Sequence, residues 1–271
     1  MRKLESVAGL NAVVTGASSG IGRALALRLT AGGAKVALVA RRADRLEALA
    51  GEIRAAGGEA LVVECDVADR AESLTAADRV LQQFGRVDLL VNNAGYGHHR
   101  RFLDWDLDDI ERMMRVNYFG ALYWTKALLP QMVAQKKGWL VFVASVAGKL
   151  GVPEESAYAA SKFAMVGLAE ALSYEVDDAG VQVLTVCPGT IRTEFFDEEA
   201  LRRMPPVARR MMVEVEPLVD AIMNSLAKGH YELTFPRFIA TGYIVRALAP
   251  GLMRRSTKRT TLDAIGKGGS E

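Results

Sequence analysis

The stretch Val-Val-Thr-Gly-Ala-Ser-Ser-Gly-Ile-Gly at residues 13–22 decides the fold of this chain. An apolar run is followed by three glycines within seven positions, and an Ala- and Leu-rich segment with helical periodicity comes next. This order predicts a strand, a tight turn and the start of a helix. Gly16 permits a sharp turn, while Gly20 and Gly22 lack a Cβ, so a diphosphate could approach the helix N-terminus. A purely structural loop is the alternative, because a glycine trio alone is weak evidence for a ligand.

Strand-like and helix-like patterns alternate along most of the remaining sequence. Apolar strand patterns are found at residues 35–40, 60–65, 87–91, 139–145, 181–187 and 232–235. Helical patterns are found at 43–56, at 68–84, at 107–135 with a break near Asn117, and at 156–178. Such alternation predicts an α/β fold, a doubly wound Rossmann-type parallel sheet with helices on both faces. In such sheets ligands bind beyond the carboxyl ends of the strands, so the motifs found there should share one cleft.

Composition limits the class of protein. The 271 residues are 50% hydrophobic and carry a net charge of +2, which favours a buried sheet and gives no reason to expect a nucleic-acid partner. Cys65 and Cys187 lie in or at the end of apolar runs and are predicted to be buried thiols, and no metal site is predicted. The first residues lack the apolar core of a signal peptide, which predicts a cytoplasmic protein. We expect a single domain over residues 1–255 and a disordered polar tail at 256–271.

A tyrosine and a lysine four positions apart, Tyr158 and Lys162, form the candidate reactive group. On a helix they lie on one face, one turn apart. A phenol has a pKa of about 10 and is a poor acid or base at neutral pH, but a neighbouring ammonium group favours the phenolate. Ser145 ends the preceding strand at the same edge of the sheet, where its hydroxyl could hold a carbonyl oxygen beside the phenol. Without Ser145, such a pair would indicate only an exposed helix surface.

The end of the second strand indicates the cofactor. In dinucleotide folds an acidic residue at this position binds the ribose 2′-hydroxyl, whereas arginine accommodates a 2′-phosphate. Here Arg41 and Arg42 follow the strand, and the first carboxylate is Asp44. Guanidinium groups suit phosphate, so we predict NADP(H) rather than NAD(H). Asp66, after the third strand, either binds the adenine amine or caps the next helix.

Five motifs together resemble the short-chain dehydrogenase/reductase family, in its shorter single-domain branch. They are Thr15 to Gly22, Asn92-Asn93-Ala94-Gly95, Asn117, Ser145 with Tyr158 and Lys162, and Pro188-Gly189 followed by Thr190 and Thr193. The resemblance covers roughly Gly9 to Thr193 and shows no departure in the catalytic set. It implies a seven-stranded sheet in the order 3-2-1-4-5-6-7.

The resemblance also implies a role for each matching residue. Tyr158 would be the general acid/base, and Ser145 would position and polarise the substrate oxygen. Lys162 would lower the Tyr158 pKa and bind the nicotinamide ribose, and Asn117 would support a water that leads protons to Lys162. Asn92 would steady the central strands. With Tyr158 and Lys162, the predicted cofactor-binding residues are Gly16, Ser18, Ser19, Gly20, Ile21, Gly22, Arg41, Arg42, Asp66, Val67, Asn93, Ala94, Gly95 (along the adenine ribose), Pro188, Gly189, Thr190, Ile191 and Thr193.

Three further segments have both functional and structural interpretations. His98-His99-Arg100-Arg101 is predicted to be a solvated loop, the alternative being an anion site at the substrate mouth. Residues 190–212 either cover a hydrophobic substrate or pack on the sheet. Residues 237–255 mix apolar and basic side chains, and we favour packing over a subunit or the substrate mouth, rather than contact with a membrane surface. The apolar stripe of 190–212, broken by Pro205-Pro206, consists of Phe195, Phe196, Leu201, Met204, Val207, Met211 and Met212.

The leading hypothesis is an NADPH-dependent oxidoreductase that transfers hydride between the nicotinamide and a carbonyl or secondary alcohol of a hydrophobic substrate. A reductase of 3-oxoacyl thioesters, which would dock a carrier through Arg100 and Arg101, is the alternative within the same fold. A non-catalytic dinucleotide sensor is a third hypothesis, and the intact catalytic set argues against it. The resemblance further implies a homodimer or homotetramer built on the two long helices, 107–135 and 156–178.

Overall fold

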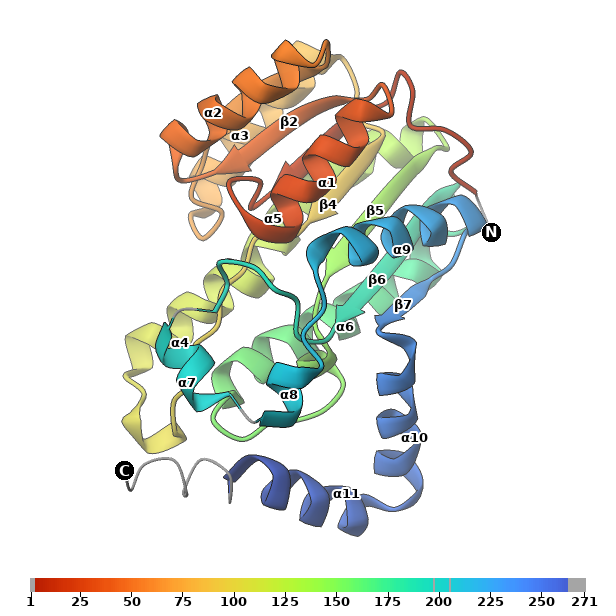
Figure 1. The fold of residues 1–271 in the computed structure, drawn as a ribbon. Coiled ribbons are helices and arrows are strands. Elements are labelled where there is room, and N and C mark those ends of the chain that lie inside the picture. Colours follow the sequence, from red (N-terminus) through yellow and green to blue (C-terminus); the bar gives the residue numbers. More distant parts are fainter. Residues whose placement is uncertain (1–2, 197, 205, 263–271) are drawn as a thin grey trace.

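A seven-stranded parallel sheet forms the centre of the computed structural model, which describes residues 3–196, 198–204 and 206–262 (Figure 1). The strand order, β3-β2-β1-β4-β5-β6-β7, confirms the predicted doubly wound Rossmann-type sheet. Each neighbouring pair of strands is parallel. The strands are β1 (Asn11–Thr15), β2 (Lys35–Ala40), β3 (Glu59–Glu64), β4 (Leu89–Asn92), β5 (Gly138–Val143), β6 (Val181–Pro188) and β7 (Glu232–Phe235).

Helices cover both faces of this sheet. Side chains of α1, α2 and α9 share a core with one face, and those of α3, α5 and α6 share a core with the other. The helix α9 is missing from the predicted elements, although Val219, Ile222 and Leu226 recur at helical spacing. The helices are α1 (Gly20–Ala31), α2 (Ala43–Ala55), α3 (Arg70–Phe84), α4 (Leu107–Met114), α5 (Gly120–Ala134), α6 (Ser156–Val176), α7 (Glu198–Arg203), α8 (Pro206–Arg210), α9 (Val215–Lys228), α10 (Ala240–Leu248) and α11 (Pro250–Thr257). Shorter turns are η1 (Phe102–Asp104), η2 (Arg115–Phe119), η3 (Val146–Gly148), η4 (Arg237–Ile239) and η5 (Lys258–Leu262).

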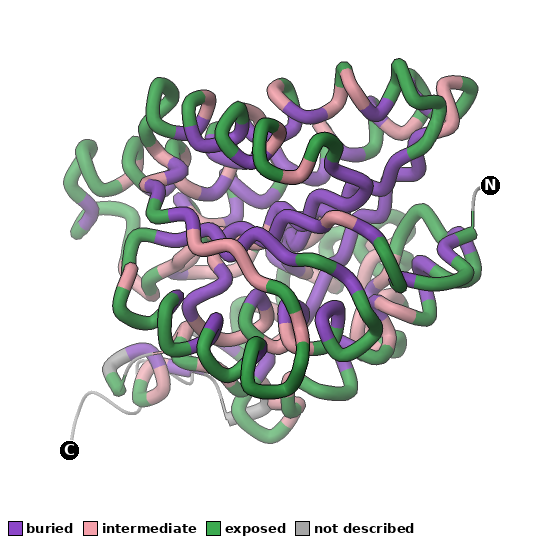
Figure 2. Tube along the Cα trace, turned by 90° about the horizontal axis from the view of Figure 1, so that it is seen from above, coloured by how far each residue is buried: buried purple, intermediate pink, exposed green. Residues whose placement is uncertain are grey.

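Alternate residues of each strand enter two separate cores. Val14 and Leu38 belong to the core under α1, α2 and α9, whereas Val13 and Val39 belong to the core under α3, α5 and α6. A strand buried on both faces needs no polar alternation, which explains the continuous apolar runs in the sequence. Figure 2 shows the strands buried at the centre and the outward surfaces of the helices exposed. This double burial fixes the strand ends, and with them the loops that carry the predicted motifs.

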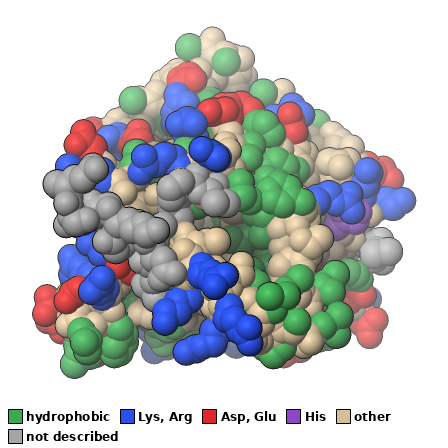
Figure 3. Space-filling view, turned by 60° about the horizontal axis from the view of Figure 1, so that its bottom comes forward, with side chains coloured by type: hydrophobic (Ala, Val, Ile, Leu, Met, Phe, Trp, Pro, Cys, Tyr) green, Lys and Arg blue, Asp and Glu red, His purple; other side chains and the backbone are tan. Residues whose placement is uncertain are grey.

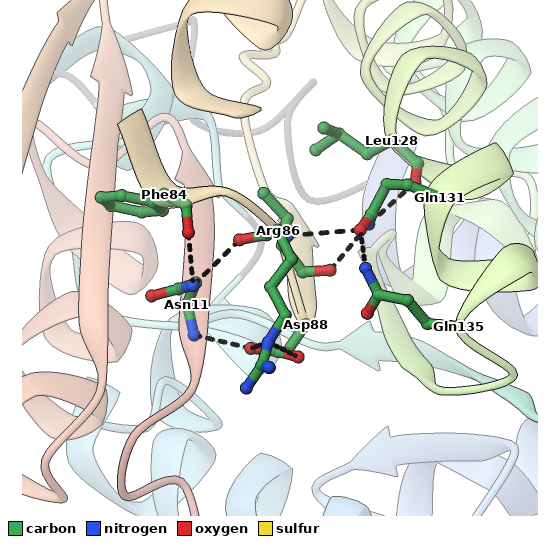
Figure 4. Close-up of polar contacts among 8 residues, drawn as sticks. Asn11, Phe84, Arg86, Asp88, Leu128, Gln131 and Gln135 are labelled. Carbon is green, nitrogen blue, oxygen red and sulfur yellow. Dashed lines mark hydrogen bonds and ion pairs between the residues drawn. The ribbon is translucent and has the colours of Figure 1, made fainter. Parts of the chain in front are cut away.

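Polar side chains join the amino-terminal edge of the sheet, away from those motifs. The Asn11 amide donates to the backbone oxygens of Phe84 and Arg86 at 3.2 and 3.0 Å (Figure 4). Gln131 of α5 donates to the backbone oxygen of Val87 at 2.7 Å. These contacts hold the loop between α3 and β4 against both β1 and α5.

The C-terminal segment leaves the sheet after β7 and forms an arm, α10 and α11 (Figure 1). Residues 256–262 do not form the predicted disordered tail: they end α11 and continue in the π-helical turn η5. The prediction failed because polar composition does not reveal which residues are buried. Thr261 is only 7% exposed. The remainder of the predicted tail, 263–271, lies outside the described residues.

One side of this arm packs on the body. The Arg246 guanidinium lies 5.4 Å from the Phe163 ring of α6, and the Tyr243 and Thr234 hydroxyls are 3.4 Å apart. The exposed side carries large hydrophobic residues, namely Phe238, Ile244, Leu248 and Leu252. Packing is therefore one part of the arm's role, and contact with a subunit or a membrane surface stays a prediction. Across the described ranges, no helix combines the length and apolarity needed to cross a bilayer.

Candidate active site

A cavity of about 730 Å³ lies at the carboxyl ends of the central strands, within the size range of small-molecule sites. Seen from the lower end of Figure 1, the surface has a hollow bordered by hydrophobic side chains, with Lys and Arg side chains gathered beside it (Figure 3). The cavity brings together nearly all predicted site residues. Those that line it are Gly16, Ser18, Ser19, Gly20, Ile21, Arg41, Arg42, Asp66, Val67, Asn93, Ala94, Gly95, Ser145, Tyr158, Lys162, Pro188, Gly189, Thr190, Ile191 and Thr193.

The glycine turn after β1 forms one end of the cavity. Gly16 and Gly20 have φ angles of +67° and +54°, in the region that favours glycine. Gly22 is not among the lining residues, and a Cβ there would lie 2.5 Å from the Asn93 amide nitrogen. The missing Cβ of Gly22 thus makes room for the Gly16 carbonyl and the Asn93 side chain, and its part in binding a diphosphate stays a prediction.

The predicted guanidinium groups lie over this turn. The Arg42 guanidinium donates to the Ser18 and Ser19 hydroxyls at 2.8 and 2.9 Å. Arg41 lines the cavity beside it. The Glu194 carboxylate, which the sequence does not single out, lies 3.8 Å from the Arg42 guanidinium. The loop beyond β6 therefore reaches across to the glycine turn, and Arg42 is held from two sides.

Asp66 does not cap helix α3. Asp69 is the cap, and its side chain accepts from the backbone N–H of Glu72 at 2.9 Å. Asp66 instead accepts from the backbone of Ala68 at 3.1 Å and pairs with Arg112 of α4 at 2.7 Å. Although burial opposes it, hydrogen bonds from Arg112 and Ala68 hold the pKa of Asp66 below its usual value. The carboxylate is thus ionised at neutral pH and lines the cavity, which leaves the adenine interpretation as a prediction.

Ser145, Tyr158 and Lys162 meet at the other end of the cavity, as predicted. The Tyr158 and Ser145 hydroxyls are hydrogen bonded, and the Ser145 oxygen also accepts from the backbone N–H of Ala147 at 3.1 Å. The Lys162 ammonium donates to the Val143 carbonyl at 2.9 Å and lies 5.7 Å from the centre of the Tyr158 ring. The end of β5 and the first turns of α6 thus hold three functional groups in one corner.

Burial controls the protonation states in this corner. Burial raises the pKa of Tyr158 above its usual value, and the hydrogen bond with Ser145 offsets this only in part. Burial also lowers the pKa of Lys162 to about 8. In this structure desolvation of the phenolate is the largest influence on the Tyr158 pKa, and the lowering implied for Lys162 stays a prediction. Tyr158 is a protonated phenol at neutral pH, which is the form that can donate a proton.

A π-helical turn, Arg115–Phe119, breaks the long predicted helix at Asn117, as expected. The buried Asn117 side chain accepts from the Tyr96 N–H at 3.0 Å and donates to the Ser161 hydroxyl at 2.9 Å. Ser161 in turn donates to the Tyr158 carbonyl at 2.7 Å. Asn117 does not line the cavity, so these contacts make it a residue that positions the loop after β4 and helix α6. The water path implied for Asn117 stays a prediction.

The segment after β4 joins the two ends of the site. The Asn93 amide donates to the Thr15 carbonyl at 2.9 Å, so Asn93 connects the ends of β1 and β4. Asn92, in β4, donates to the Thr125 hydroxyl of α5 at 2.9 Å, and its implied role in steadying the central strands stays a prediction. Gly95 was predicted to lie along the adenine ribose, but a Cβ there would be 3.3 Å from the Lys162 ammonium. Gly95 therefore belongs to the catalytic end of the cavity.

The loop that contains His98-His99-Arg100-Arg101 is not simply solvated. His98 and His99 line the cavity, and the His99 Nδ1 atom is 3.3 Å from a Glu155 carboxylate oxygen. The prediction of a solvated loop is wrong for His99, whose ring stacks on that of Phe196 in the 190–212 segment at 6.3 Å. His98 is exposed, as that prediction expects, and its ring contacts Tyr96 and Trp105. The exposed Arg100 and Arg101 form ion pairs with carboxylates of the protein.

The 190–212 segment lines the cavity, which agrees with one of its two predicted roles. The Phe195 ring lies 5.7 Å from the Tyr158 ring. Phe195, Phe196, Met204 and Met211 line the cavity, whereas Leu201 and Met212 are half-buried elsewhere. Pro205 and the side chains of Pro206 and Val207 lie outside the described residues.

Several lining residues were missed from the sequence. Thr260 and Thr261 reach the cavity from the C-terminal arm, and no local pattern marks them. Ile239 also lines it, which agrees with the predicted alternative that the 237–255 segment packs over the substrate mouth. Glu155 is different, because it precedes Tyr158 by three positions and shares its helix face. That spacing could have identified Glu155 as a neighbour of the reactive group.

The cysteines are buried thiols, as predicted. Cys65 and Cys187 are 1% and 0% exposed, and burial raises the pKa of each to about 12. Thiols in that state are unreactive at neutral pH. In the parts of the chain that the structure describes, no group of three or more His, Cys, Asp or Glu side chains is placed to hold a metal ion.

The model of the short chain dehydrogenase family matches residues 10–203. The chain belongs to the short-chain dehydrogenase/reductase family. A curated relative, 3-ketodihydrosphingosine reductase of Bos taurus, is 33% identical over 255 residues, which cover 90% of this chain and 75% of the relative. A solved short-chain dehydrogenase/reductase from Burkholderia phymatum in complex with NAD has a TM-score of 0.82 and 28% identity, covering 92% of this chain and 96% of that one. A metagenomic short-chain oxidoreductase in complex with NADP has a TM-score of 0.73 and 31% identity, covering 84% and 97% of the two chains.

Family membership makes this dehydrogenase/reductase an oxidoreductase that binds a nicotinamide dinucleotide. The cavity fits such a group, because the Cβ-free turn at Gly16 and Gly20 lies at one end and the reactive corner lies at the other. The two solved neighbours hold NAD in one case and NADP in the other. The choice between the two cofactors therefore depends on the residues of this chain.

Proposed function

We propose that this dehydrogenase/reductase uses NADPH to reduce the carbonyl group of a hydrophobic substrate, and catalyses the reverse oxidation of the secondary alcohol. The supporting observation is that Ser145, Tyr158 and Lys162 meet in one corner of a cavity whose far end is the glycine turn. A non-catalytic sensor of the dinucleotide would need the turn but not the hydrogen-bonded corner.

The residues of the corner divide the work of proton transfer. NADPH, when bound, would supply the hydride that the carbonyl carbon accepts. Ser145 and Tyr158 hold the carbonyl oxygen between two hydroxyl groups, which positions the carbon for attack. Because the pKa of Tyr158 is raised, the phenol keeps its proton until negative charge develops on that oxygen, and then donates it. The Lys162 ammonium stabilises the phenolate that remains and binds the nicotinamide ribose.

The preference for NADPH rests on the charge at the end of β2. Arg41 and Arg42 both line the cavity there, and Arg42 is hydrogen bonded across the loop to Ser18 and Ser19. These donors form a group suited to a 2′-phosphate, with Ser18 and Ser19 ready to share the contact. Strand β2 itself ends in Ala40, so no carboxylate occupies the position that binds a 2′-hydroxyl in NAD-specific folds.

The apolar walls support a hydrophobic substrate. Phe195, Phe196, Met204 and Met211 line the cavity, and flexible Met side chains suit an apolar chain of variable shape. The relative from Bos taurus is named for its action on 3-ketodihydrosphingosine, a ketone, which agrees with this class. A 3-oxoacyl thioester is the second candidate substrate. Its proposed docking residues, Arg100 and Arg101, are exposed but already form ion pairs, which favours the free ketone.

Consumption of NADPH with a panel of long-chain ketones and 3-oxoacyl thioesters tests the proposal. We expect turnover of long-chain ketones that is at least tenfold faster with NADPH than with NADH, and none in the Tyr158→Phe variant. Failure of every ketone, with rapid turnover of thioesters, would favour the second candidate. Binding of NADPH without turnover of any compound would favour the sensor.

Assembly and location form part of the same proposal. We expect residues 1–255 to act as one unit in a homodimer or homotetramer, and the exposed Phe119, Phe163 and Tyr174 on the long helices are suited to a subunit contact. We expect the protein in the cytoplasm, with contact of the 237–255 arm to a membrane surface as the disfavoured alternative. Light scattering of the purified protein gives the oligomeric state, and flotation with liposomes tests the arm.

A further inference from the structure

The substrate end of the cavity contains a carboxyl group that the proposed mechanism does not use. Glu155 immediately precedes α6 and lies three positions before Tyr158, so the two side chains are neighbours on one face of that helix. Both line the cavity. The Glu155 side chain is only 19% exposed.

Apolar side chains share the cavity with Glu155, which is itself largely buried. Val152, Phe196 and Met204 line the same cavity, and the only cause that shifts its titration is burial, which raises the pKa of Glu155 to about 7. The His99 Nδ1 atom, 3.3 Å from the carboxylate, is its polar neighbour in the cavity wall. A carboxyl group in such a wall loses its hydration and gains little from the protein in return.

Two arginines near this part of the cavity pair with the residue next to Glu155. The guanidinium groups of Arg101 and Arg203 pair with Glu154, the preceding residue, whose side chain is 2% exposed. The two adjacent glutamates therefore differ in their partners: Glu154 pairs with arginines, and Glu155 lies beside a histidine. Glu154 ties the 190–212 segment to the loop before α6, whereas Glu155 lines the cavity and has its carboxylate beside His99.

We propose that Glu155, oriented by His99, is a subsite for a cationic amine that the substrate carries near its carbonyl group. The inference rests on the proposed function and names its substrate class: a long-chain amino ketone. The carbonyl oxygen would lie between Ser145 and Tyr158, the amine would pair with Glu155 about one helical turn away, and the chain would lie along Phe195, Phe196 and Met211. The proposal therefore places the amine one or two bonds from the carbonyl carbon.

A pair of matched ketones tests the subsite. One is a long-chain 1-(dimethylamino)-2-ketone and the other is the 2-ketone of equal length without the amine. Hydrogen bonds to charged groups are worth about tenfold or more in affinity, so we expect the wild-type protein to favour the amino ketone in kcat/KM by about that factor. In Glu155→Gln, which keeps the shape and removes the charge, we expect this ratio to fall about tenfold. The ratio is insensitive to a general loss of activity or folding, because both substrates meet the same variant.

Two controls make the result specific. Glu175→Gln removes a carboxylate from the exposed part of the same helix and should leave the ratio as in the wild type. The matching 1-hydroxy-2-ketone separates charge from hydrogen bonding. If the wild-type protein favours the hydroxy ketone as strongly as the amino ketone, the cationic subsite is wrong.

A binding measurement separates the subsite from the proposed function. Calorimetry with a long-chain alkyl dimethylamine and with the alkanol of equal length, in the presence of NADPH, requires no turnover. We expect the amine to bind the wild-type protein about tenfold more tightly than the alkanol, and equally in Glu155→Gln. Equal binding to the wild-type protein, or a preference that survives in Glu155→Gln, would overturn the subsite. If the amine binds as expected but no ketone is reduced, the proposed function fails and the subsite stands.

Discussion

Replacing Arg42 with alanine should weaken NADPH binding and leave NADH binding nearly unchanged. The guanidinium already donates to two loop hydroxyls at 2.8 and 2.9 Å, so it is held in place beside the glycine turn before a ligand arrives. A hydrogen bond to a charged group contributes about 1.5–3 kcal/mol. The Arg42 side chain is 45% exposed, which places the contribution at the lower end because solvent screens it. A loss of about 1.5 kcal/mol corresponds to an increase of roughly tenfold in the Kd for NADPH.

Calorimetric titration with both dinucleotides at fixed ionic strength measures this difference. Arg45→Ala is the matched control, because Arg45 also pairs with Glu194 but does not line the cavity. The control should alter neither Kd by more than about twofold, since exposed ion pairs contribute little. An equal loss of affinity for NADPH and NADH in Arg42→Ala would refute the assignment of this end of the cavity to a 2′-phosphate. Arg41→Asp should give a larger change in the same direction, because it adds a repelling carboxylate.

Three further predictions concern the reactive corner and the turn. Tyr158→Phe should lower kcat by at least about a hundredfold and leave the Kd for NADPH within a factor of two or so, as measured by steady-state assay and titration; retained turnover would exclude Tyr158 as the proton donor. Burial lowers the pKa of Lys162 from 10.5 to about 8, so the unfolded state binds more protons between these values, and the free energy of unfolding should rise as pH increases through that window. Over this pH window the free energy of unfolding of the wild-type protein, measured with urea, should rise by up to about 3 kcal/mol relative to that of Lys162→Met. Identical pH profiles of the two proteins would contradict the prediction. Gly22→Ala should cost about 1–3 kcal/mol of stability, because the new Cβ would lie 2.5 Å from the Asn93 amide nitrogen, whereas Gly51→Ala, with open space around it, should be neutral or stabilising.

Most of the fold could be predicted because local pattern and burial agree along the sheet. The inner strands, β2, β1, β4, β5 and β6, are buried on both faces, so their apolar runs are visible without knowledge of their neighbours. The helix α9 was missed because it follows the 190–212 segment, where short helices and prolines obscure the periodicity. Residues 256–262 were wrongly predicted to belong to a disordered tail, because the burial of Thr261 depends on a cavity built from distant parts of the chain.

The site could be predicted as far as motifs at strand ends determine it. Tyr158, Lys162 and Ser145 come together because β5 and α6 bring them to one edge of the sheet. The protonation state of Tyr158 could not be derived in the same way, since spacing reveals the neighbouring Lys162 but not the extent of burial. Glu155 shows the same limit: its position beside Tyr158 is visible in the sequence, but its apolar surroundings come from segments far away in the chain.

A crystal structure of the complex with NADP tests the central claim most directly. The account predicts the nicotinamide ring beside the Tyr158 hydroxyl, with Ser145 on the same side and the 2′-phosphate between Arg41 and Arg42. A dinucleotide bound with its nicotinamide far from Tyr158, or a Tyr158 hydroxyl turned away from the ring, would contradict it.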